Sequence, residues 1–185
     1  MKNIKFPICA ASLFILMSCV DLNLNPLSEG SSENWYSSQA EIEMSLNDFY
    51  RKEFFPIDDM MWGDDVTARN STSAINNGTL TSEDWTIASR WENYYKGIAR
   101  ALRIIKNMDR ARAMGVSEND ITQYEGEAYF YLGYAYGMLA FHWGDAILDK
   151  EGMSLDEAYT ASRSPKADVL AYSYECLDKA AERLP

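Results

Sequence analysis

Two long stretches of helical periodicity limit what this chain can fold into. Apolar residues recur at steps of three or four positions in both stretches, and such spacing puts them on one face of an α-helix. The first set is Trp91, Tyr95, Ile98, Leu102, Ile105 and Met108, and the second is Ile121, Tyr124, Ala128, Tyr131, Ala135 and Met138. We therefore expect helices over residues 84–113 and 117–144, joined as an antiparallel hairpin because few residues separate them. The rings in both sets are assigned to the core.

Glycine is unusually frequent inside the second of these helices. Gly126, Gly133 and Gly137 all lie on it, although each glycine costs a helix about 1 kcal/mol relative to alanine. Close packing is the simplest reason for such a cost. We expect tyrosine and tryptophan rings of the neighbouring helix to lie against these small residues, as in tetratricopeptide-like helix pairs.

Capping signals predict further helices on both sides of the hairpin. Ser38 and Glu41 form a capping box for a first helix that should end at Pro56, and Ser154 with Glu157 indicates a short helical turn. The first helix should bury Ile42, Leu46, Phe49 and Tyr50.

A last helix should begin after Ser164, with this serine as N-cap and Pro165 at the first helical position. Its apolar face would be Val169, Tyr172, Cys176, Ala180 and Leu184. We expect Cys176 to be a small buried hydrophobe rather than a nucleophile.

These elements define an all-α fold of tetratricopeptide-like helical hairpins with long loops. About three helical repeats are needed for a stable stack, whereas roughly one and a half can be counted here. We therefore predict that the sequence is the N-terminal fragment of a larger helical-repeat protein, with an incomplete helical domain over residues 35–185.

The N-terminus has the layout of an export signal. Lys2 and Lys5 precede an apolar core of about 10 residues, half of the ~20 that a membrane-spanning helix needs. The core ends in "LMSC", residues 16–19, which resembles the bacterial lipobox. We predict a lipoprotein signal peptide over residues 1–18, acylation of Cys19, and a lipidated tether over residues 19–34. The alternative is an ordinary signal peptide with a cysteine nearby by chance.

The charge of the chain excludes some partners. The net charge is −11, and removal of residues 1–18 takes away two lysines and no acids. Nucleic-acid binding requires a basic patch, so we expect no nucleic-acid partner. For the same reason, the folded surface should not bind anionic lipid headgroups, and only the acyl anchor would hold the protein to a membrane.

Catalysis and metal binding have little support in the sequence. His142 is the only histidine, and we expect it to be a satisfied, partly buried side chain rather than a catalytic base. Asp58, Asp59, Asp64 and Asp65 could suggest calcium, but their spacing does not match an EF-hand, so a solvated acidic loop is the better interpretation. We predict no enzymatic activity, no metal and no cofactor.

A long aperiodic segment, residues 55–82, is the best candidate for a binding loop. A pyranose ring offers an apolar C–H face and a rim of hydroxyl groups. Trp62 could provide an aromatic plane for that face, and Arg69 and Asn70 could bond the hydroxyls. The alternative is that Trp62 enters the core and the polar pair only closes the loop.

The order of several motifs resembles the N-terminal part of the SusD/RagB family. They are "LMSC", "LNPLSEG", "WENYYKGIARALRIIKNM", "ITQYEGEAYFYLGYAYGMLAFHWGD" and "SLDEAYTASRSPKADVLAYSYECLDKAAERLP". Leu132 and Gly133 depart from the family pattern, which has an arginine and an alanine there. The resemblance implies a lipoprotein of the outer membrane, on the cell surface of a Gram-negative bacterium, that captures glycan.

The resemblance also implies a partner, a SusC-like TonB-dependent transporter to which the glycan would be delivered. Two other functions remain open at this point. One is a helical-repeat lipoprotein scaffold that binds only protein, and the other is an exported hydrolase. The sequence does not say which glycan would be bound.

Overall fold

The computed structural model describes residues 35–56, 63 and 74–185. The chain divides into two units, Met1–Trp35 and Tyr36–Pro185, and all the described helices belong to the second. The predicted signal peptide, Cys19 and the tether lie outside the described residues. The helices are α2 (Gln39–Asn47), the 3₁₀ turn η1 (Asp48–Tyr50), α3 (Trp85–Lys106), α4 (Met108–Ala113), α5 (Glu118–His142), α6 (Leu155–Thr160) and α7 (Lys166–Ala181).

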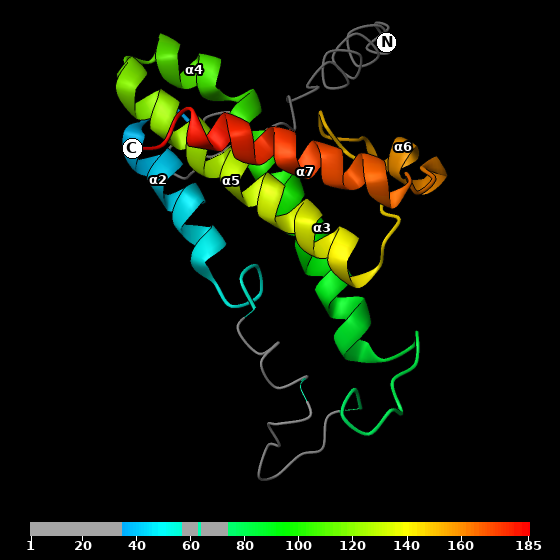
Figure 1. Cartoon of the computed structure of the whole chain (residues 1–185). Coiled ribbons are helices and arrows are strands. Elements are labelled where there is room, and N and C mark those ends of the chain that lie inside the picture. Colours follow the sequence, from blue (N-terminus) through cyan, green and yellow to red (C-terminus); the bar gives the residue numbers. More distant parts are fainter. Residues whose placement is uncertain (1–34, 57–62, 64–73) are drawn as a thin grey trace, which may run out of the picture. The chain divides into compact units, whose positions relative to one another are not determined.

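Helix α5 is the centre of the fold. It packs against α3 on one side and α7 on another, with further contacts to α2 and α4. Figure 1 shows that α5 runs opposite to α3 and that α7 runs back along α5. The described residues contain no strand, only an isolated bridge between Ala146 and Ser164. The predicted all-α class and the antiparallel hairpin are therefore confirmed. None of the described helices is both long and apolar enough to cross a membrane.

Glycines on α5 allow α7 to approach closely. A Cβ atom placed on Gly133 would lie 2.6 Å from Leu177 Cγ and 3.0 Å from the Ser173 carbonyl oxygen. The Ser173 hydroxyl donates a 2.7 Å hydrogen bond to the Gly133 carbonyl, inside the interface. Close packing was correctly predicted, but its partners were not. Leucine and serine of α7 occupy the space above Gly133, because α7 and not α3 covers this face.

The aromatic rings pack on the other side of α5. Tyr131 stacks on Phe49 with centroids 4.4 Å apart, and its ring would overlap any Cβ atom on Gly97 of α3. The buried residues of α3 include Tyr94, Ile98, Ala101, Leu102 and Ile104. Trp91, Tyr95 and Ile105 are only half-buried. The buried face of α3 is thus turned slightly from the predicted one, since Tyr94 rather than Tyr95 points into the core.

The predicted helix over residues 84–113 is broken at Asn107. This residue has φ −101° and ψ 4°, and its side-chain amide donates a 2.7 Å hydrogen bond to the Arg103 carbonyl. A side chain that bonds its own backbone competes with the helical hydrogen-bond ladder. Two helices, α3 and α4, therefore replace the single predicted one, and Gly115 ends α4 with φ +92°.

Helix α2 begins as predicted and ends earlier. The Ser38–Glu41 capping box is present, and Ile42, Leu46 and Phe49 are buried. The prediction for Tyr50 was wrong, because this side chain is 72% exposed. The chain tightens into η1 after Asn47 and becomes extended at Arg51, so the helix ends before Pro56 and Tyr50 turns away from the core.

The start of α7 is capped from a distance. Pro165 is the N-cap without any side-chain hydrogen bond, whereas Ser164 pairs with Ala146 through its backbone N–H and carbonyl, at 2.8 and 3.2 Å. The carboxylate of Asp145 accepts a 2.8 Å hydrogen bond from the Lys166 N–H. The predicted helix exists, with Val169, Tyr172, Cys176 and Ala180 buried. The predicted Ser164 cap was wrong, because the Asp145 carboxylate, 21 positions before Lys166, takes its place.

Candidate functional site

The sugar-binding residues predicted from the sequence are not tested by the structure. Trp62, Arg69 and Asn70 lie outside the described residues, as do Asp58, Asp59, Asp64 and Asp65. Between residues 57 and 73, only Gly63 is described. Its carbonyl accepts a 3.0 Å hydrogen bond from the Asn76 side chain.

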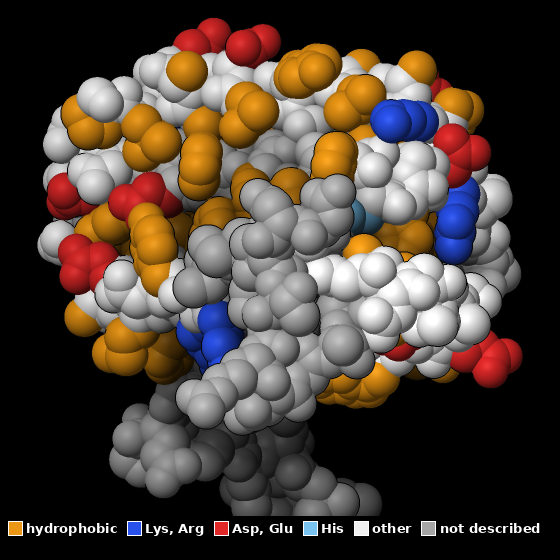
Figure 2. Space-filling model, turned by 60° about the horizontal axis from the view of Figure 1, so that its bottom comes forward, with side chains coloured by type: hydrophobic (Ala, Val, Ile, Leu, Met, Phe, Trp, Pro, Cys, Tyr) orange, Lys and Arg blue, Asp and Glu red, His pale blue; other side chains and the backbone are white. Residues whose placement is uncertain are grey.

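Large hydrophobic side chains are exposed at several places on the described surface. Figure 2 shows one face on which such side chains are spread among acidic and basic ones. Trp85 is the only tryptophan among the exposed large hydrophobic residues of the described part of the chain, at 79%. A tryptophan of such exposure adds little to the core and has a full ring face available to a ligand.

Trp85 is placed by the start of α3. The Asp84 side chain accepts a 2.8 Å hydrogen bond from the Thr86 N–H and so caps the helix. Ahead of the cap, the chain turns at Gly78, with φ +66°, and the Asp84 N–H bonds the Thr81 carbonyl. Trp85 therefore stands on the first turn of a long, well-packed helix, which gives it a fixed position.

A hollow with a volume of about 350 Å³ lies beside this ring, near the lower limit of small-molecule sites. We call it the Trp85 hollow. It is formed by one side of α3 and by the chain that follows η1. The lining residues are Lys52, Glu53, Pro56, Trp85, Thr86, Ser89, Arg90 and Asn93.

The hollow combines groups that suit a neutral, hydroxyl-rich ligand. Asn93 has a planar amide, Thr86 and Ser89 have hydroxyls, and Trp85 provides an apolar plane. Its charges are of both signs, because Glu53 faces a lining that also contains Lys52 and Arg90. The Ser89 hydroxyl is oriented by a 3.2 Å hydrogen bond to the Thr86 carbonyl. Such a lining offers donors and acceptors without a strong field of one sign.

Sequence reasoning missed Trp85, although a signal was present. The apolar positions of α3 follow the stripe that includes Trp91 and Ile98, and Trp85 falls off this stripe. A tryptophan outside the apolar stripe of a helix has no core to enter, so it is a better candidate for ligand contact than one on the stripe.

Two further hollows occur in the described part of the chain. One, with a volume of about 390 Å³, is bounded by Tyr50, Phe55 and Phe130, with Gln123 and Glu127 beside them. The other, with a volume of about 590 Å³, lies between α3 and the chain before α6. The first lacks an exposed tryptophan, and the second borders α6 through Glu157.

The described titratable groups include one histidine and several glutamates with shifted pKa values. His142 is half-buried with its ring against Phe141 and Trp143, at centroid distances of 4.9 and 5.5 Å. Arg112, Ser154 and Lys179 lower the carboxyl pKa values of Glu118, Glu157 and Glu175, respectively. A glycosidase acid needs a raised carboxyl pKa instead. No group of three or more metal-ligating side chains occurs within the described ranges.

Cys176 is buried in the α5–α7 interface as a free thiol, as predicted. Burial raises the pKa of this thiol above its usual value. A protonated, enclosed thiol is a weak nucleophile.

The antiparallel packing of α3, α5 and α7 defines a class, that of all-α helical-hairpin proteins. A family model described as starch-binding and associating with the outer membrane, SusD-like, matches residues 28–185. The chain belongs to this SusD-like family. The resemblance seen in the sequence is thereby confirmed.

Individual relatives agree with the family assignment. A SusD-like protein P2 of Formosa agariphila is 24% identical over 190 residues, which cover 94% of this chain and 36% of that protein. A SusD superfamily protein of Bacteroides vulgatus has a similar structure, with a TM-score of 0.67 and 19% identity over 82% of this chain and 36% of its own. A SusD-like carbohydrate binding protein of Bacteroides fragilis gives a TM-score of 0.66 at 19% identity, over 82% and 33%. The chain therefore spans about a third of the length of these relatives.

Proposed function

We propose that this chain belongs to a lipid-anchored protein of the outer-membrane surface that binds glycan and delivers it to a TonB-dependent transporter. The exposed Trp85 ring above a mixed polar hollow is the observation that supports the sugar site. The family description as starch-binding and associating with the outer membrane supports both the ligand class and the location. The protein would bind without catalysis, and the transporter partner rests on the family resemblance alone.

The binding mode follows from the chemistry of the hollow. The apolar face of a pyranose would lie on the Trp85 ring, and the ring hydroxyls would bond Asn93, Thr86 and Ser89. Trp62, Arg69 and Asn70 remain proposed sugar contacts from the segment that precedes α3.

Affinity electrophoresis in starch and in a panel of other polysaccharides tests the sugar site. The chain should be retarded by at least one polysaccharide, and Trp85→Ala should lower the affinity about tenfold. Trp62→Ala should also weaken binding if the second set contributes. Tyr159→Ala is the matched control, because it removes an exposed ring of a different helix, 81% exposed on α6.

The outcome separates the candidate functions. Retardation lost in Trp85→Ala and kept in Tyr159→Ala supports the proposed site. If both variants are retarded equally, Trp85 does not contribute to sugar binding. If no polysaccharide retards the chain, a scaffold that binds only protein is favoured. Release of reducing sugar that depends on one carboxylate would establish a hydrolase.

The anchor is tested by replacement of Cys19 with alanine in cells that perform lipoprotein processing. The unmodified protein should fractionate with the outer membrane, because a multiply acylated cysteine anchors stably. Cys19→Ala should move it to the soluble fraction. Persistence of the variant in the membrane fraction would reject acylation of Cys19.

A further inference from the structure

The chain between α5 and α7 contains an ordered segment without a fully buried side chain. All residues from 150 to 160 are exposed, and α6 has no buried side chain. The large apolar side chains of this segment are exposed, with exposed fractions of 36% for Met153, 70% for Leu155 and 81% for Tyr159. We call residues 149–160 the α6 platform. Since burial of apolar surface does not order the platform, other contacts must hold it.

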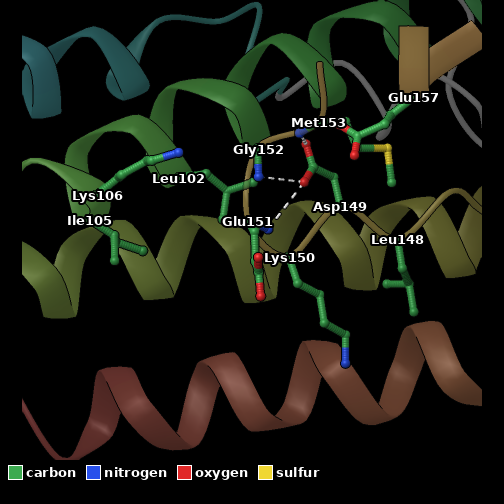
Figure 3. Close-up of a pocket in the computed structure, with 10 residues that line it drawn as sticks. All are labelled: Leu102, Ile105, Lys106, Leu148, Asp149, Lys150, Glu151, Gly152, Met153 and Glu157. Carbon is green, nitrogen blue, oxygen red and sulfur yellow. Dashed lines mark hydrogen bonds between the residues drawn. The ribbon is translucent and has the colours of Figure 1, made fainter. Parts of the chain in front are cut away.

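Hydrogen bonds hold the start of the platform. The Asp149 carboxylate accepts hydrogen bonds from the backbone N–H groups of Glu151, Gly152 and Met153, at 3.2, 2.6 and 2.9 Å, and Figure 3 shows this side chain turned into its own loop. The hydroxyl of Tyr136, from the core of α5, accepts from the Asp149 N–H at 2.9 Å and donates to the Asp149 carbonyl at 2.7 Å. The loop is therefore fixed both to itself and to the central helix.

The neighbouring chain is fixed in the same way. The Tyr95 hydroxyl of α3 accepts from the Ile147 N–H at 2.7 Å and donates to the Ile147 carbonyl at 2.9 Å. At the platform itself, the Ser154–Glu157 capping box closes the first turn of α6. The buried Tyr136 and the half-buried Tyr95 thus position a segment that contributes no side chain to the core.

This arrangement presents apolar side chains in a fixed position. Single exposed apolar residues are common, but a cluster of them on one short segment marks an interaction site. The hydrogen bonds order the backbone in advance, so less conformational entropy is lost on binding. A hollow with a volume of about 590 Å³ adjoins the platform, with apolar walls from Leu102, Ile105 and Leu148 (Figure 3).

The charge of the platform indicates the chemistry of its partner. Glu151, Asp156 and Glu157 are exposed there. The only cation of the platform, Lys150, lies over the Tyr172 ring at 4.6 Å and points toward α7. Lys106 of α3 also lines the adjoining hollow. The three exposed acids still outnumber the one cation of the platform itself, in a chain with a net charge of −11. A complementary surface would present apolar side chains surrounded by lysine or arginine.

We propose that the α6 platform is a preformed docking surface for a protein partner that presents an apolar anchor flanked by basic side chains. The partner is the transporter, so the proposal rests on the proposed function for the identity of the partner. The apolar anchor would enter the hollow beside Leu102 and Ile105, and its flanking residues would contact Leu155 and Tyr159. Asp156 would face the basic side chains.

Site-specific photo-crosslinking tests this surface. The full-length protein is co-expressed with a TonB-dependent transporter of the same bacterium, with a benzophenone amino acid at position 159 or, as a control, at position 50. Tyr50 is a matched control because it is 72% exposed and lies on η1, far from α6 in Figure 1. Irradiation should link position 159, and not position 50, to the transporter.

Substitutions give an independent measurement. The double variant Leu155→Ala/Tyr159→Ala should raise the Kd for the detergent-solubilised transporter at least about tenfold. Asp156→Lys should do so mainly at low ionic strength, since salt screens exposed charges. Tyr50→Ala should leave the Kd unchanged. The side chains of all four residues are exposed, so their replacement should not disturb the core. Circular dichroism should therefore show unchanged helix content in every variant.

The failures of the two proposals are distinguishable. If the transporter co-purifies but position 159 does not crosslink to it, the platform proposal is wrong and the partner stands. If no transporter co-purifies, the partner in the proposed function is wrong, and the platform proposal falls with it. A crosslink from position 159 to another part of the same polypeptide would show an internal contact and overturn the docking surface. Loss of glycan retardation in the Leu155→Ala/Tyr159→Ala variant would mark the platform as a sugar site and overturn it as well.

Discussion

Helix α5 contacts α3 and α7 through opposite arrangements of large and small residues. Toward α3, α5 contributes the Tyr131 ring, and α3 contributes Gly97 to make room for it. Toward α7, α5 contributes the glycines, and Leu177 and Ser173 of α7 fill the space above Gly133. Either helix of a pair can supply the small residue. A glycine inside a helical sequence therefore indicates close packing but does not show which helix packs against it.

The largest expected effect is at the α3 interface. Gly97→Ala would force a methyl group into the Tyr131 ring, which itself stacks on Phe49 and cannot move freely. Overpacking of this kind should lower the free energy of unfolding by about 3 kcal/mol. Urea denaturation of the purified chain measures it. An unchanged urea midpoint would show that the ring can turn away and that this interface is not tightly packed.

A smaller loss is expected at the α7 interface. Gly133→Ala places a methyl group against Leu177 and the Ser173 backbone, and the gain in helix propensity offsets part of the strain. We expect a net destabilisation of about 1–2 kcal/mol in urea denaturation.

Gly137→Ala is the control for this substitution. Its Cβ atom would lie 3.3 Å from Ser173 Oγ, a contact that a small shift can relieve. The variant should be neutral or more stable by up to about 1 kcal/mol, from helix propensity alone. Equal destabilisation by the two substitutions would mean that α7 contacts α5 along a broader surface than the glycine at position 133.

Two tyrosines of α5 should respond differently to loss of the hydroxyl. Tyr136→Phe removes both hydrogen bonds to the Asp149 backbone and should cost about 1–2 kcal/mol. The buried Tyr131 hydroxyl has no hydrogen-bond partner among the described residues, so Tyr131→Phe should be neutral or slightly stabilising. Urea denaturation and hydrogen exchange around residue 149 should distinguish the two variants. A larger loss in Tyr131→Phe would contradict the assignment.

Alkaline pH should weaken the link between α3 and the loop after α5. Burial raises the pKa of Tyr95 to about 12, above the value near 10 of an unfolded tyrosine. The unfolded chain therefore loses this proton first. The contribution to stability should be constant below pH 10 and decrease between pH 10 and 12.

Urea midpoints across this pH range measure the effect. The decrease should be shallower in Tyr95→Phe than in the unmodified protein. Identical slopes in the Tyr95 variant and the unmodified protein would place the alkaline sensitivity elsewhere.

Much of the fold could be predicted because its signals are local. The period of the apolar residues located α3 and α5, and the Ser38 and Ser154 caps located the starts of α2 and α6. Family membership was also predictable, because the motifs that carry it are contiguous in the chain. The candidate site was not: Trp85 became a candidate only when its exposure was known, and the predicted Trp62, Arg69 and Asn70 remain predictions.

The sequence by itself determined the helices, their order and the antiparallel hairpin, since periodicity and capping act within a few residues. The tertiary structure decided which helix covers the glycines of α5, how α7 is capped by Asp145, and which tyrosine hydroxyls find partners. These features depend on residues that are distant in sequence, from 21 positions for the Asp145 cap to 52 for the Tyr95 contact. Such contacts leave no local pattern, because their geometry exists only after the helices have packed.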